Sequence, residues 1–413
     1  MATEALRPLK IMLVAGEPSG DALGAELIAA LHSLTAGSVK IIGVGGPLME
    51  AQGFTSLYGL EDTAVMGLRE VVPKVPKIIR RIRQARDFAL HERPDVTVLI
   101  DSPDFTNRVA AAVRRRDPSL KLVKYVAPQV WASRSYRAKQ MTVYFDHVLC
   151  LLPFEPDFFE SVGLHASFVG HPVIERAKLM TGGEHFRAKF GIFPDQKLLL
   201  VLPGSRSSEI RFILPVIRET VARLVREIPR LVTVLPTVSH VAEKVKAATA
   251  NWPTSLHVIE DERTKFQAFV AADASLAASG TVTTELALAR TPMVVAYKVG
   301  ALTAAIARRF INVRYFTLVN LILDQLAVPE LIQNDCTAEK ILPAIRLLLT
   351  DETARQAQVA AFEEVAKALG EGDEKPSLRA ARALLSIASG NSPKLASPAA
   401  HLAAQNAPGE AAV

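Results

Sequence analysis

Two aspartates follow the apolar segment Val96–Ile100, in the order Asp101-Ser102-Pro103-Asp104-Phe105. A carboxylate at the end of a buried parallel strand faces the ligand crevice of an open α/β sheet, where it can take a proton from a hydroxyl group. It can equally cap the helix that begins near Phe105. We interpret Asp104 as a cap. For Asp101 the catalytic and the structural interpretations both remain open.

A second polar turn, in the stretch VAGEPSGDALG, follows the apolar segment Leu9–Ala15. A phosphate-binding P-loop has four residues between its glycines and then a lysine, whereas here three residues separate the glycines and Asp21 follows Gly20. Glu17, Ser19 and Gly20 offer a carboxylate, a hydroxyl and backbone N–H groups, which suit sugar hydroxyls better than a bare phosphate. The alternative is that Ser19 and Asp21 only cap the following helix.

The second half of the chain contains a loop of the kind that binds anions. Pro203-Gly204-Ser205-Arg206 lies between the apolar segment Leu198–Leu202 and a helical pattern. Backbone N–H groups at a helix start attract an anion, and the guanidinium of Arg206 adds a permanent charge. We therefore predict that Ser205 and Arg206 bind phosphate, with a surface salt bridge as the alternative for Arg206.

A comparable loop, Ser279-Gly280-Thr281, opens the helical stretch after residues 274–277. Two such loops in one domain suggest a diphosphate. Glu285 lies about one turn further on and could accept hydrogen bonds from ribose hydroxyls. We find no Asp-x-Asp motif and no metal-ligand spacing among the histidines, so we expect no metal and no cofactor; helix dipoles and Arg206 would neutralise the diphosphate.

A basic amphipathic stretch runs from Asp62 to Phe88. Its apolar residues follow helical spacing among seven lysines and arginines, and Pro73 and Pro76 are expected to break its first part into a loop or short helix. The alternatives are a helix packed on its sheet and an element that lies on an anionic membrane, and the valine-rich turns around the prolines favour the membrane. The residues expected to make this contact are Leu68, Val71, Val72 and Val75.

The elements that must position these residues can be inferred from length and pattern. A chain of 413 residues is long enough for two domains of typical size. Apolar runs alternate with helical patterns throughout, which is typical of parallel sheets with crossover helices. We predict two doubly wound Rossmann-like α/β domains that face a cleft, followed by C-terminal helices. The predicted boundaries are 1–172, 173–389 with the closing helices, and 390–413 as a disordered tail.

Composition limits the surroundings and the partners. Two widely separated cysteines and the absence of a signal-peptide core or membrane-length apolar run favour a cytoplasmic protein. The net charge of +6 favours acidic partners, namely nucleotides, phosphorylated sugars, an anionic membrane surface or nucleic acid.

Taken together, these motifs resemble the lipid-A-disaccharide synthase family of GT-B glycosyltransferases, over roughly residues 9–385. The resemblance is carried by Gly16–Asp21, Val65-Met66-Gly67, Asp101–Phe105, Pro203–Arg206 with Glu209, and Ala278–Thr281 with Glu285. It implies an inverting transfer from UDP-2,3-diacylglucosamine to the 6-hydroxyl of 2,3-diacylglucosamine 1-phosphate, which gives the β(1→6) disaccharide phosphate and UDP.

The resemblance also implies roles for single residues. Asp101 would be the base, Arg206 would be required for catalysis, and Asn320 would lie at the active site. Val65 and Met66 would join the loop that touches the membrane. The protein would lie on the cytoplasmic face of the inner membrane, could form a homodimer and would bind no nucleic acid. The alternatives are another GT-B transferase or epimerase acting on UDP-N-acetylglucosamine, and a non-enzymatic UDP-binding membrane protein.

Overall fold

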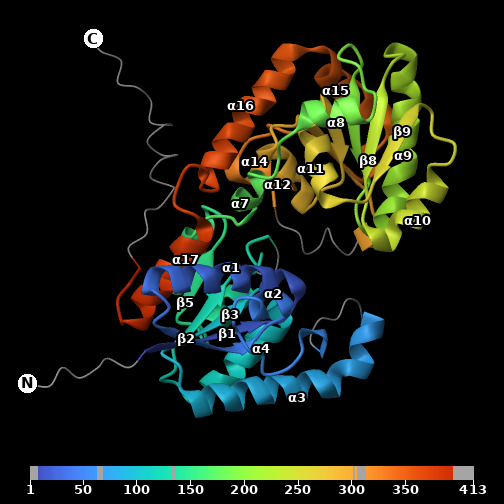
Figure 1. The fold of residues 1–413 in the computed structure, drawn as a ribbon. Coiled ribbons are helices and arrows are strands. Elements are labelled where there is room, and N and C mark those ends of the chain that lie inside the picture. The colour runs from blue at the N-terminus through green and yellow to red at the C-terminus, as the bar shows by residue number, and fades with distance from the viewer. Residues whose placement is uncertain (1–7, 63–67, 133–135, 301–302, 305–312, 394–413) are drawn as a thin grey trace, which may run out of the picture. The chain divides into compact units, whose positions relative to one another are not determined.

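A computed structural model describes residues 8–62, 68–132, 136–300, 303–304 and 313–393, without the side chains of residues 68–74. The chain forms two compact units (Figure 1). The first comprises the residues up to Pro172 together with those from Gly372 onward, and the second is Val173–Glu371. The predicted sites at Val65 and Met66, and the predicted tail from residue 394 on, lie outside the described residues.

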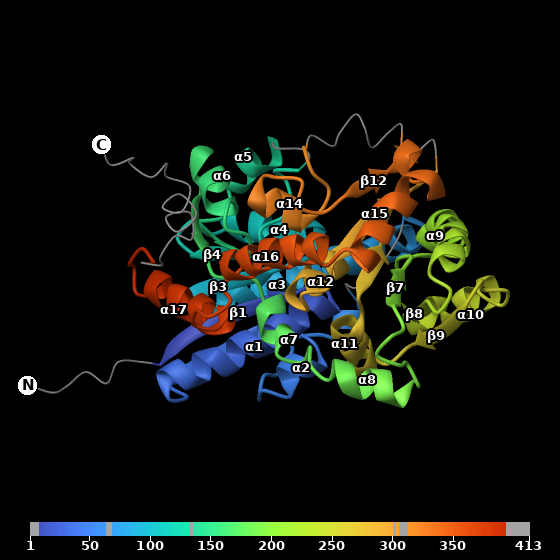
Figure 2. The same ribbon diagram turned by 90° about the horizontal axis from the view of Figure 1, so that it is seen from above.

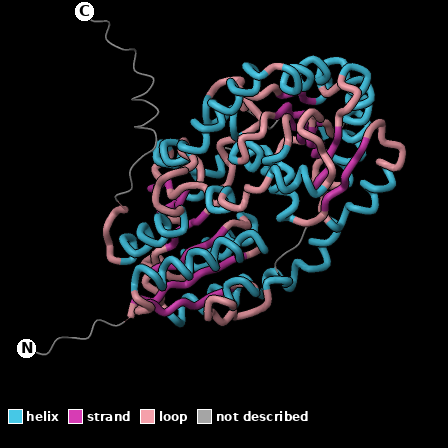
Figure 3. Tube along the Cα trace, turned by 45° about the horizontal axis from the view of Figure 1, so that its top comes forward, coloured by secondary structure: helices cyan, strands magenta, loops and turns pink. Residues whose placement is uncertain are grey.

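The first unit is built on a six-stranded parallel sheet with the strand order β2-β1-β3-β4-β5-β6. Figure 3 shows strands in magenta with helices in cyan packed over them. β1 lies between β2 and β3, so the chain adds β2 on one side of β1 and β3 on the other. The strands are β1 Leu9–Ala15, β2 Val39–Val44, β3 Val96–Ile100, β4 Leu122–Tyr125, β5 His147–Cys150 and β6 His165–Phe168.

Helices cover both faces of this sheet, and α1 and α3 lie on opposite faces (Figure 1). They are α1 Pro18–Thr35, α2 Pro47–Glu50, α3 Leu68–Glu92, α4 Pro103–Arg114, α5 Tyr136–Met141, α6 Glu155–Ser161 and α17 Pro376–Ala388, with a 3₁₀ turn η1 at Leu60–Asp62. Alternate side chains of a strand point to opposite faces. Accordingly Ile11 and Leu13 of β1 join the core under α1, whereas Met12 and Val14 join the core under α3.

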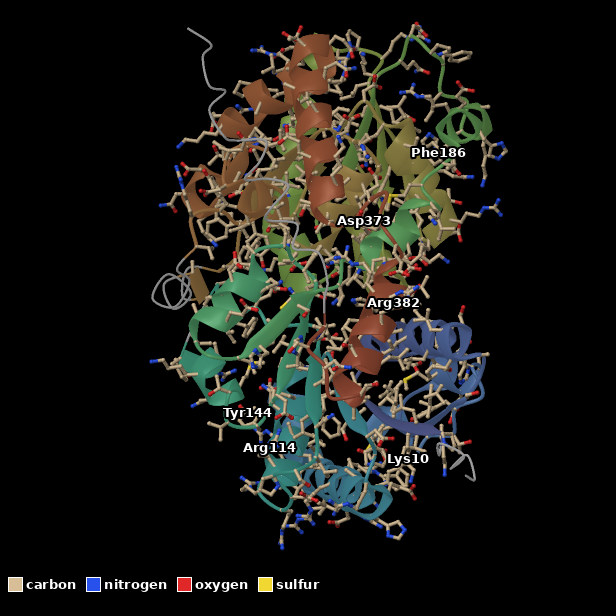
Figure 4. The ribbon with its side chains drawn as sticks, turned by 90° about the vertical axis from the view of Figure 1, so that its left-hand side faces the viewer. Lys10, Arg114, Tyr144, Phe186, Asp373 and Arg382 are labelled. Carbon is tan, nitrogen blue, oxygen red and sulfur yellow. The ribbon has the colours of Figure 1, made fainter. Side chains whose placement is uncertain are left out.

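The C-terminal helix α17 belongs to the first unit and packs against α1 (Figure 4). Its apolar side chains, such as Leu384, enter the core under α1. The buried Arg379 pairs with Asp373 at 3.1 Å and donates to the carbonyl of Phe168 at 3.2 Å. The sequence-based division assigned residues 372–389 to the second domain, whereas they belong to the first unit. The structure differs because the apolar face of α17 is buried against α1 and β3.

The second unit repeats the architecture with the strand order β12-β11-β10-β7-β8-β9, again parallel throughout. Its strands are β7 Leu198–Leu202, β8 Val232–Pro236, β9 Ser255–Ile259, β10 Ala274–Ala277, β11 Met293–Tyr297 and β12 Glu330–Ile332. β7 lies between β10 and β8, so the strand order reverses at β7 just as it does at β1 in the first sheet.

The helices of the second unit again form two layers. They are α7 Val173–Ala177, α8 Gly183–Lys189, α9 Ser207–Glu227, α10 Ser239–Ala248, α11 Glu262–Ala271, α12 Thr281–Leu288, α14 Leu318–Leu323, α15 Ala338–Thr350 and α16 Glu352–Ala368, with a 3₁₀ turn η2 at Gln333–Asp335. α9 and α15 contact each other and share one core with Leu199 and Val201 of β7 (Figure 2). The predicted pair of doubly wound α/β domains is therefore confirmed as a fold class.

One local prediction is wrong. α3 is a single helix from Leu68 to Glu92 that includes Pro73 and Pro76, although a proline lacks the N–H that closes a helical turn. The later part of α3 places Ile78, Ile82, Ala85 and Ala89 on the core of the first unit. This packing stabilises the helix more than the two prolines disfavour it.

Candidate functional site

The polar residues of the first unit gather at the point where the strand order reverses. The turn after β1 and the turn after β3 lie at the carboxyl ends of neighbouring parallel strands. Ligands of doubly wound sheets bind at such a switch point, outside the carboxyl ends of the strands. The two turns that the sequence analysis treated separately therefore belong to one site.

Two hydrogen bonds join these turns. Ser19 Oγ donates to Asp101 Oδ2 at 2.6 Å, and Ser102 Oγ donates to Glu17 Oε1 at 2.9 Å. Gly20 permits the close approach, because a Cβ there would lie 3.3 Å from the carbonyl oxygen of Ile100 at the end of β3. The structure thus brings together three of the predicted site residues, Glu17, Ser19 and Asp101, and Asp101 is half-buried.

The backbone at Asp101 is unusual. Asp101 and Ser102 both adopt the left-handed conformation, with φ of 48° and 38°. Residues other than glycine rarely do so, and each such residue costs about 1–3 kcal/mol that the surrounding contacts must offset. Strain of this kind is concentrated at functional sites because it orients a side chain that a relaxed turn would direct elsewhere.

Some of the contacts that offset this backbone strain come from a residue that the sequence analysis missed. Lys124, in the middle of β4, is fully buried, and its Nζ donates to the carbonyl of Asp101 and, at 2.7 Å, to Thr106 Oγ1. Burial lowers the pKa of Lys124 to about 7, while the carboxylates of Asp101 and Glu17 act in the opposite direction. The available signal was a lysine inside an otherwise apolar strand.

Asp21 has a structural role that the sequence did not indicate. Its buried carboxylate accepts hydrogen bonds from the backbone N–H groups of Gly46, Leu48 and Met49, at 2.8–3.0 Å. It therefore stabilises the start of α2 and not the start of α1, whose own N-cap Glu17 makes no side-chain capping bond. Asp104, which was interpreted as a cap, is exposed in the first turn of α4, and the N-cap of that helix is Ser102.

The second unit has its own switch point between β7 and β10, where the two predicted anion loops lie side by side. The loop after β7 is built around Glu209. Its Oε2 accepts from the backbone N–H groups of Ser205 at 2.9 Å and Arg206 at 3.1 Å, and its Oε1 accepts from the Arg206 guanidinium at 3.0 Å. In this structure a carboxylate of the chain binds these two N–H groups, and their contact with a phosphate stays a prediction.

Arg206 itself remains available. Its side chain is 75% exposed although one of its nitrogens bonds to Glu209, so the other guanidinium donors can still meet a ligand. Burial raises the pKa of the Tyr297 hydroxyl at the end of β11, with Glu209 adding to the effect and Arg206 opposing it. These three side chains therefore share one electrostatic environment.

The loop after β10 leads into a helix whose start has no side-chain cap. α12 begins at Thr281, its N-cap is Gly280, which has no side chain that could accept from the first N–H groups, and a Cβ placed on Gly280 would meet no atom within 4 Å. Anion binding by this helix start stays a prediction. Ser279 Oγ donates to the carbonyl of Phe316 at 3.3 Å. The helix start of α12 can accept an anion more readily than the loop after β7.

Glu285 and Asn320 are more enclosed than a direct ligand contact requires. The buried Glu285 carboxylate lies 3.1 Å from Lys265 Nζ and 3.4 Å from the Arg176 guanidinium. Asn320 is fully buried, and its side chain bonds to the backbone of Val328 in both directions and to Glu330. In this structure Asn320 supports the loop that leads to β12, and its contact with a ligand stays a prediction.

The described part of α3 is basic and partly apolar on its exposed side. Val75 and Ile79 are 40% and 41% exposed, whereas Lys77 and Arg81 both pair with the buried Asp62. The side chains of Leu68, Val71 and Val72 lie outside the described residues. Among the residues that the structure describes, no helix is long and apolar enough to cross a membrane.

Two doubly wound domains, each with polar groups at its switch point, define the GT-B architecture. Solved structures of this fold include S. aureus MnaA with UDP (TM-score 0.61, 17% identity, covering 92% of this chain and 97% of that one), Rickettsia bellii UDP-N-acetylglucosamine 2-epimerase (0.57, 16%, 92% and 97%) and Acinetobacter baumannii MurG (0.51, 15%, 88% and 99%). At these identities the likeness extends to the fold alone.

Sequence comparison identifies the family. The chain belongs to the lipid-A-disaccharide synthetase family, whose model matches residues 11–384. It is 48% identical to the lipid-A-disaccharide synthase of Rhodospirillum centenum over 92% of this chain and 95% of that protein. It is 46% identical to that of Paramagnetospirillum magneticum over 91% and 96%. The resemblance inferred from the motifs is therefore confirmed.

Gly204 tests whether Glu209 holds the loop after β7. Gly204 has φ of 108°, and a Cβ there would lie 2.8 Å from the Cβ of Glu209 and closer still to its carboxylate. We expect Gly204→Ala to lower the free energy of unfolding of the second unit by about 2–4 kcal/mol, through backbone strain and loss of the carboxylate bonds. Urea denaturation of the wild type and the variant measures this change in the free energy of unfolding. Gly280→Ala is the matched control, with an expected change below about 0.5 kcal/mol; equal losses would contradict the assignment.

Proposed function

We propose that this chain is a lipid-A-disaccharide synthase, an inverting hexosyltransferase that joins UDP-2,3-diacylglucosamine to 2,3-diacylglucosamine 1-phosphate. The observation that carries this proposal is the family match over residues 11–384, with relatives of that name at 42–48% identity. The products are the β(1→6) disaccharide 1-phosphate and UDP. Incubation with the diacylated donor and acceptor, and separately with UDP-N-acetylglucosamine, tests it against another transferase or an epimerase.

The proposed chemistry is a single displacement. The 6-hydroxyl of the acceptor attacks the anomeric carbon while its proton passes to the Asp101 carboxylate, and the bond to UDP breaks with the electron pair leaving on the diphosphate. The transition state has oxocarbenium character, so a carboxylate near the acceptor oxygen both takes the proton and favours the developing positive charge. Support comes from the position of Asp101 at the switch point and from its hydrogen bond with Ser19.

The second unit would bind the leaving UDP. Arg206, with its largely exposed guanidinium, and the open start of α12 at Ser279–Thr281 would stabilise the diphosphate. Ser205, Glu285 and Asn320 would serve this site as direct or supporting residues, whereas Glu17, Ser19 and Gly20 would serve the sugar side. We propose that the reaction requires neither metal nor cofactor. Among the residues that the structure describes, no cluster of three or more metal-ligand side chains occurs.

The surroundings of the enzyme follow from its diacylated substrates. We propose that it acts as a peripheral protein on the anionic cytoplasmic surface of the inner membrane, with the start of α3 as the contact. The exposed Val75 and Ile79 and the basic residues around them support this placement. Nucleic acid is not expected as a partner, and a homodimer remains a proposal that size measurement in solution would test.

Asp101→Asn keeps the shape of the side chain and removes the base. We expect turnover to fall roughly 10²–10⁴-fold with UDP affinity nearly unchanged and the fold retained, because the amide oxygen still accepts the bond from Ser19. Steady-state kinetics and UDP titration measure the two effects. Asp104→Asn, an exposed carboxylate three residues away, is the matched control and should keep near-normal turnover. Normal turnover of Asp101→Asn would show that another group is the base.

Arg206→Ala removes a charge-assisted contact to the leaving diphosphate. We expect a loss of about 2–4 kcal/mol in transition-state stabilisation, which is a fall of roughly 30- to 1000-fold in kcat/KM. Arg211→Ala, an exposed arginine one turn along α9, is the control and should change kcat/KM little. The wild-type rate should be the same with and without EDTA. Loss of activity in EDTA that magnesium restores would contradict the metal-free account.

The membrane proposal depends on apolar side chains at the start of α3. We expect the double substitution Val75→Ser and Ile79→Ser to weaken binding to vesicles that contain anionic lipid while leaving the melting temperature within a few degrees of wild type. Vesicle co-sedimentation and thermal unfolding measure these effects. Val143→Ser is the matched control, since this valine is 70% exposed elsewhere in the first unit. Unchanged vesicle binding by the double variant would refute the contact.

A further inference from the structure

Lys124 is buried where an apolar side chain would be expected. It lies between Val123 and Tyr125 in β4, and all three residues are essentially inaccessible to solvent. Burial of an amine costs free energy because the group loses its hydration, and hydrogen bonds inside the protein must offset that cost. Within the part of the chain that the structure describes, no carboxylate forms a salt bridge with Lys124. Its bonds go instead to the carbonyl of Asp101 and the hydroxyl of Thr106.

Both bonds act on the strained turn after β3. Thr106 Oγ1 lies 2.7 Å from the carbonyl oxygen of Asp101 and 2.9 Å from that of Ser102, so it bridges the lysine and the turn. The N–H of Asp101 donates to the carbonyl of Tyr125, the residue after Lys124, at 2.9 Å. β4 therefore fixes the peptide groups on both sides of Asp101, and the left-handed backbone has contacts that hold it.

Lys121 provides a comparison within the same unit. It precedes β4, and its Nζ donates to the carbonyls of Ile387 and Ala388 at the end of α17, at 2.9 and 3.0 Å. Both lysines thus bind chain oxygens through Nζ. Only Lys124 binds the residue proposed as the base, which separates a general contribution to folding from an effect on catalysis.

We propose that Lys124 is the positioning residue for Asp101: it holds the carbonyl of Asp101 so that the strained turn directs the carboxylate toward the acceptor hydroxyl. This inference rests on the proposed function, since it assigns Lys124 a role in the same proton transfer. Lys124 acts through Asp101 and does not itself touch the substrate. Its removal should therefore change the rate of the chemical step and leave substrate binding almost unchanged.

The test uses Lys124→Met, which keeps the length of the side chain and removes the donors. We expect kcat to fall about 10- to 100-fold with KM for both substrates within about 3-fold of wild type. Lys121→Met is the matched control, with kcat within about 2-fold of wild type. A normal kcat for Lys124→Met overturns the proposal, and so does an equal fall in kcat for both variants.

A double variant distinguishes positioning from a merely structural effect. If Lys124 acts through Asp101, adding Lys124→Met to Asp101→Asn should lower kcat by no more than about 2-fold further, because the group being positioned is already lost. Multiplication of the two single effects would overturn the proposal. Should Lys124→Met not fold, Thr106→Val removes the bridging hydroxyl instead, and the same non-additivity with Asp101→Asn is expected.

These measurements separate the two proposals. Absence of transfer by the wild-type protein would overturn the proposed function and this inference with it. Impaired Asp101→Asn beside a normal Lys124→Met would overturn only the role of Lys124. A low kcat for Lys124→Met with an unchanged KM, and no further loss in the double variant, supports both.

Discussion

The hydrogen bond from Ser19 to Asp101 joins the turns after β1 and β3, and the geometry of the candidate site in the first unit depends on it. It forms because the strand order reverses at β1, so that two turns 82 residues apart in the chain meet at one edge of the sheet. It also requires the left-handed backbone of Asp101 and Ser102. Contacts from Lys124 and Thr106 beneath the turn offset the strain. The conformation of Asp101 at the edge of the sheet therefore depends on residues in the core of the unit.

The two units use the same geometry with different chemistry. At the switch point of the first sheet, hydroxyls donate to two carboxylates, which suits proton transfer and hydrogen bonding to a sugar. At the switch point of the second sheet, the open start of α12 and the guanidinium of Arg206 offer positive charge. Glu209 neutralises part of that charge and fixes the loop. A dissociating diphosphate is best stabilised by donors that are already in place, since reorganisation then costs little.

Two helices, α17 and α3, cover opposite faces of the sheet of the first unit. α17 returns the chain to the first unit and buries its apolar face against α1. Near its start Arg379 donates to the carbonyl of Phe168, and at its end the carbonyls of Ile387 and Ala388 accept from Lys121. α3 covers the opposite face with Ile78, Ile82, Ala85 and Ala89, whereas Val75 and Ile79 are exposed. One helix can thus contribute one face to the core and present apolar side chains to a surface on another.

The sequence by itself determined the fold class, the family and many of the strands; β1, β3, β7 and β10 have the predicted bounds. These properties are local, because apolar runs and helical periods are set by neighbouring residues. The short strand β12, at the sheet edge and only half-buried, carries too weak a pattern to be recognised. Only the tertiary structure decided that Ser19 meets Asp101, that Glu209 fills the loop after β7, that Lys124 lies beneath Asp101, and that α17 joins the first unit. Each of these depends on strand order and on burial between distant segments, and no local pattern specifies which distant partner a polar side chain will find.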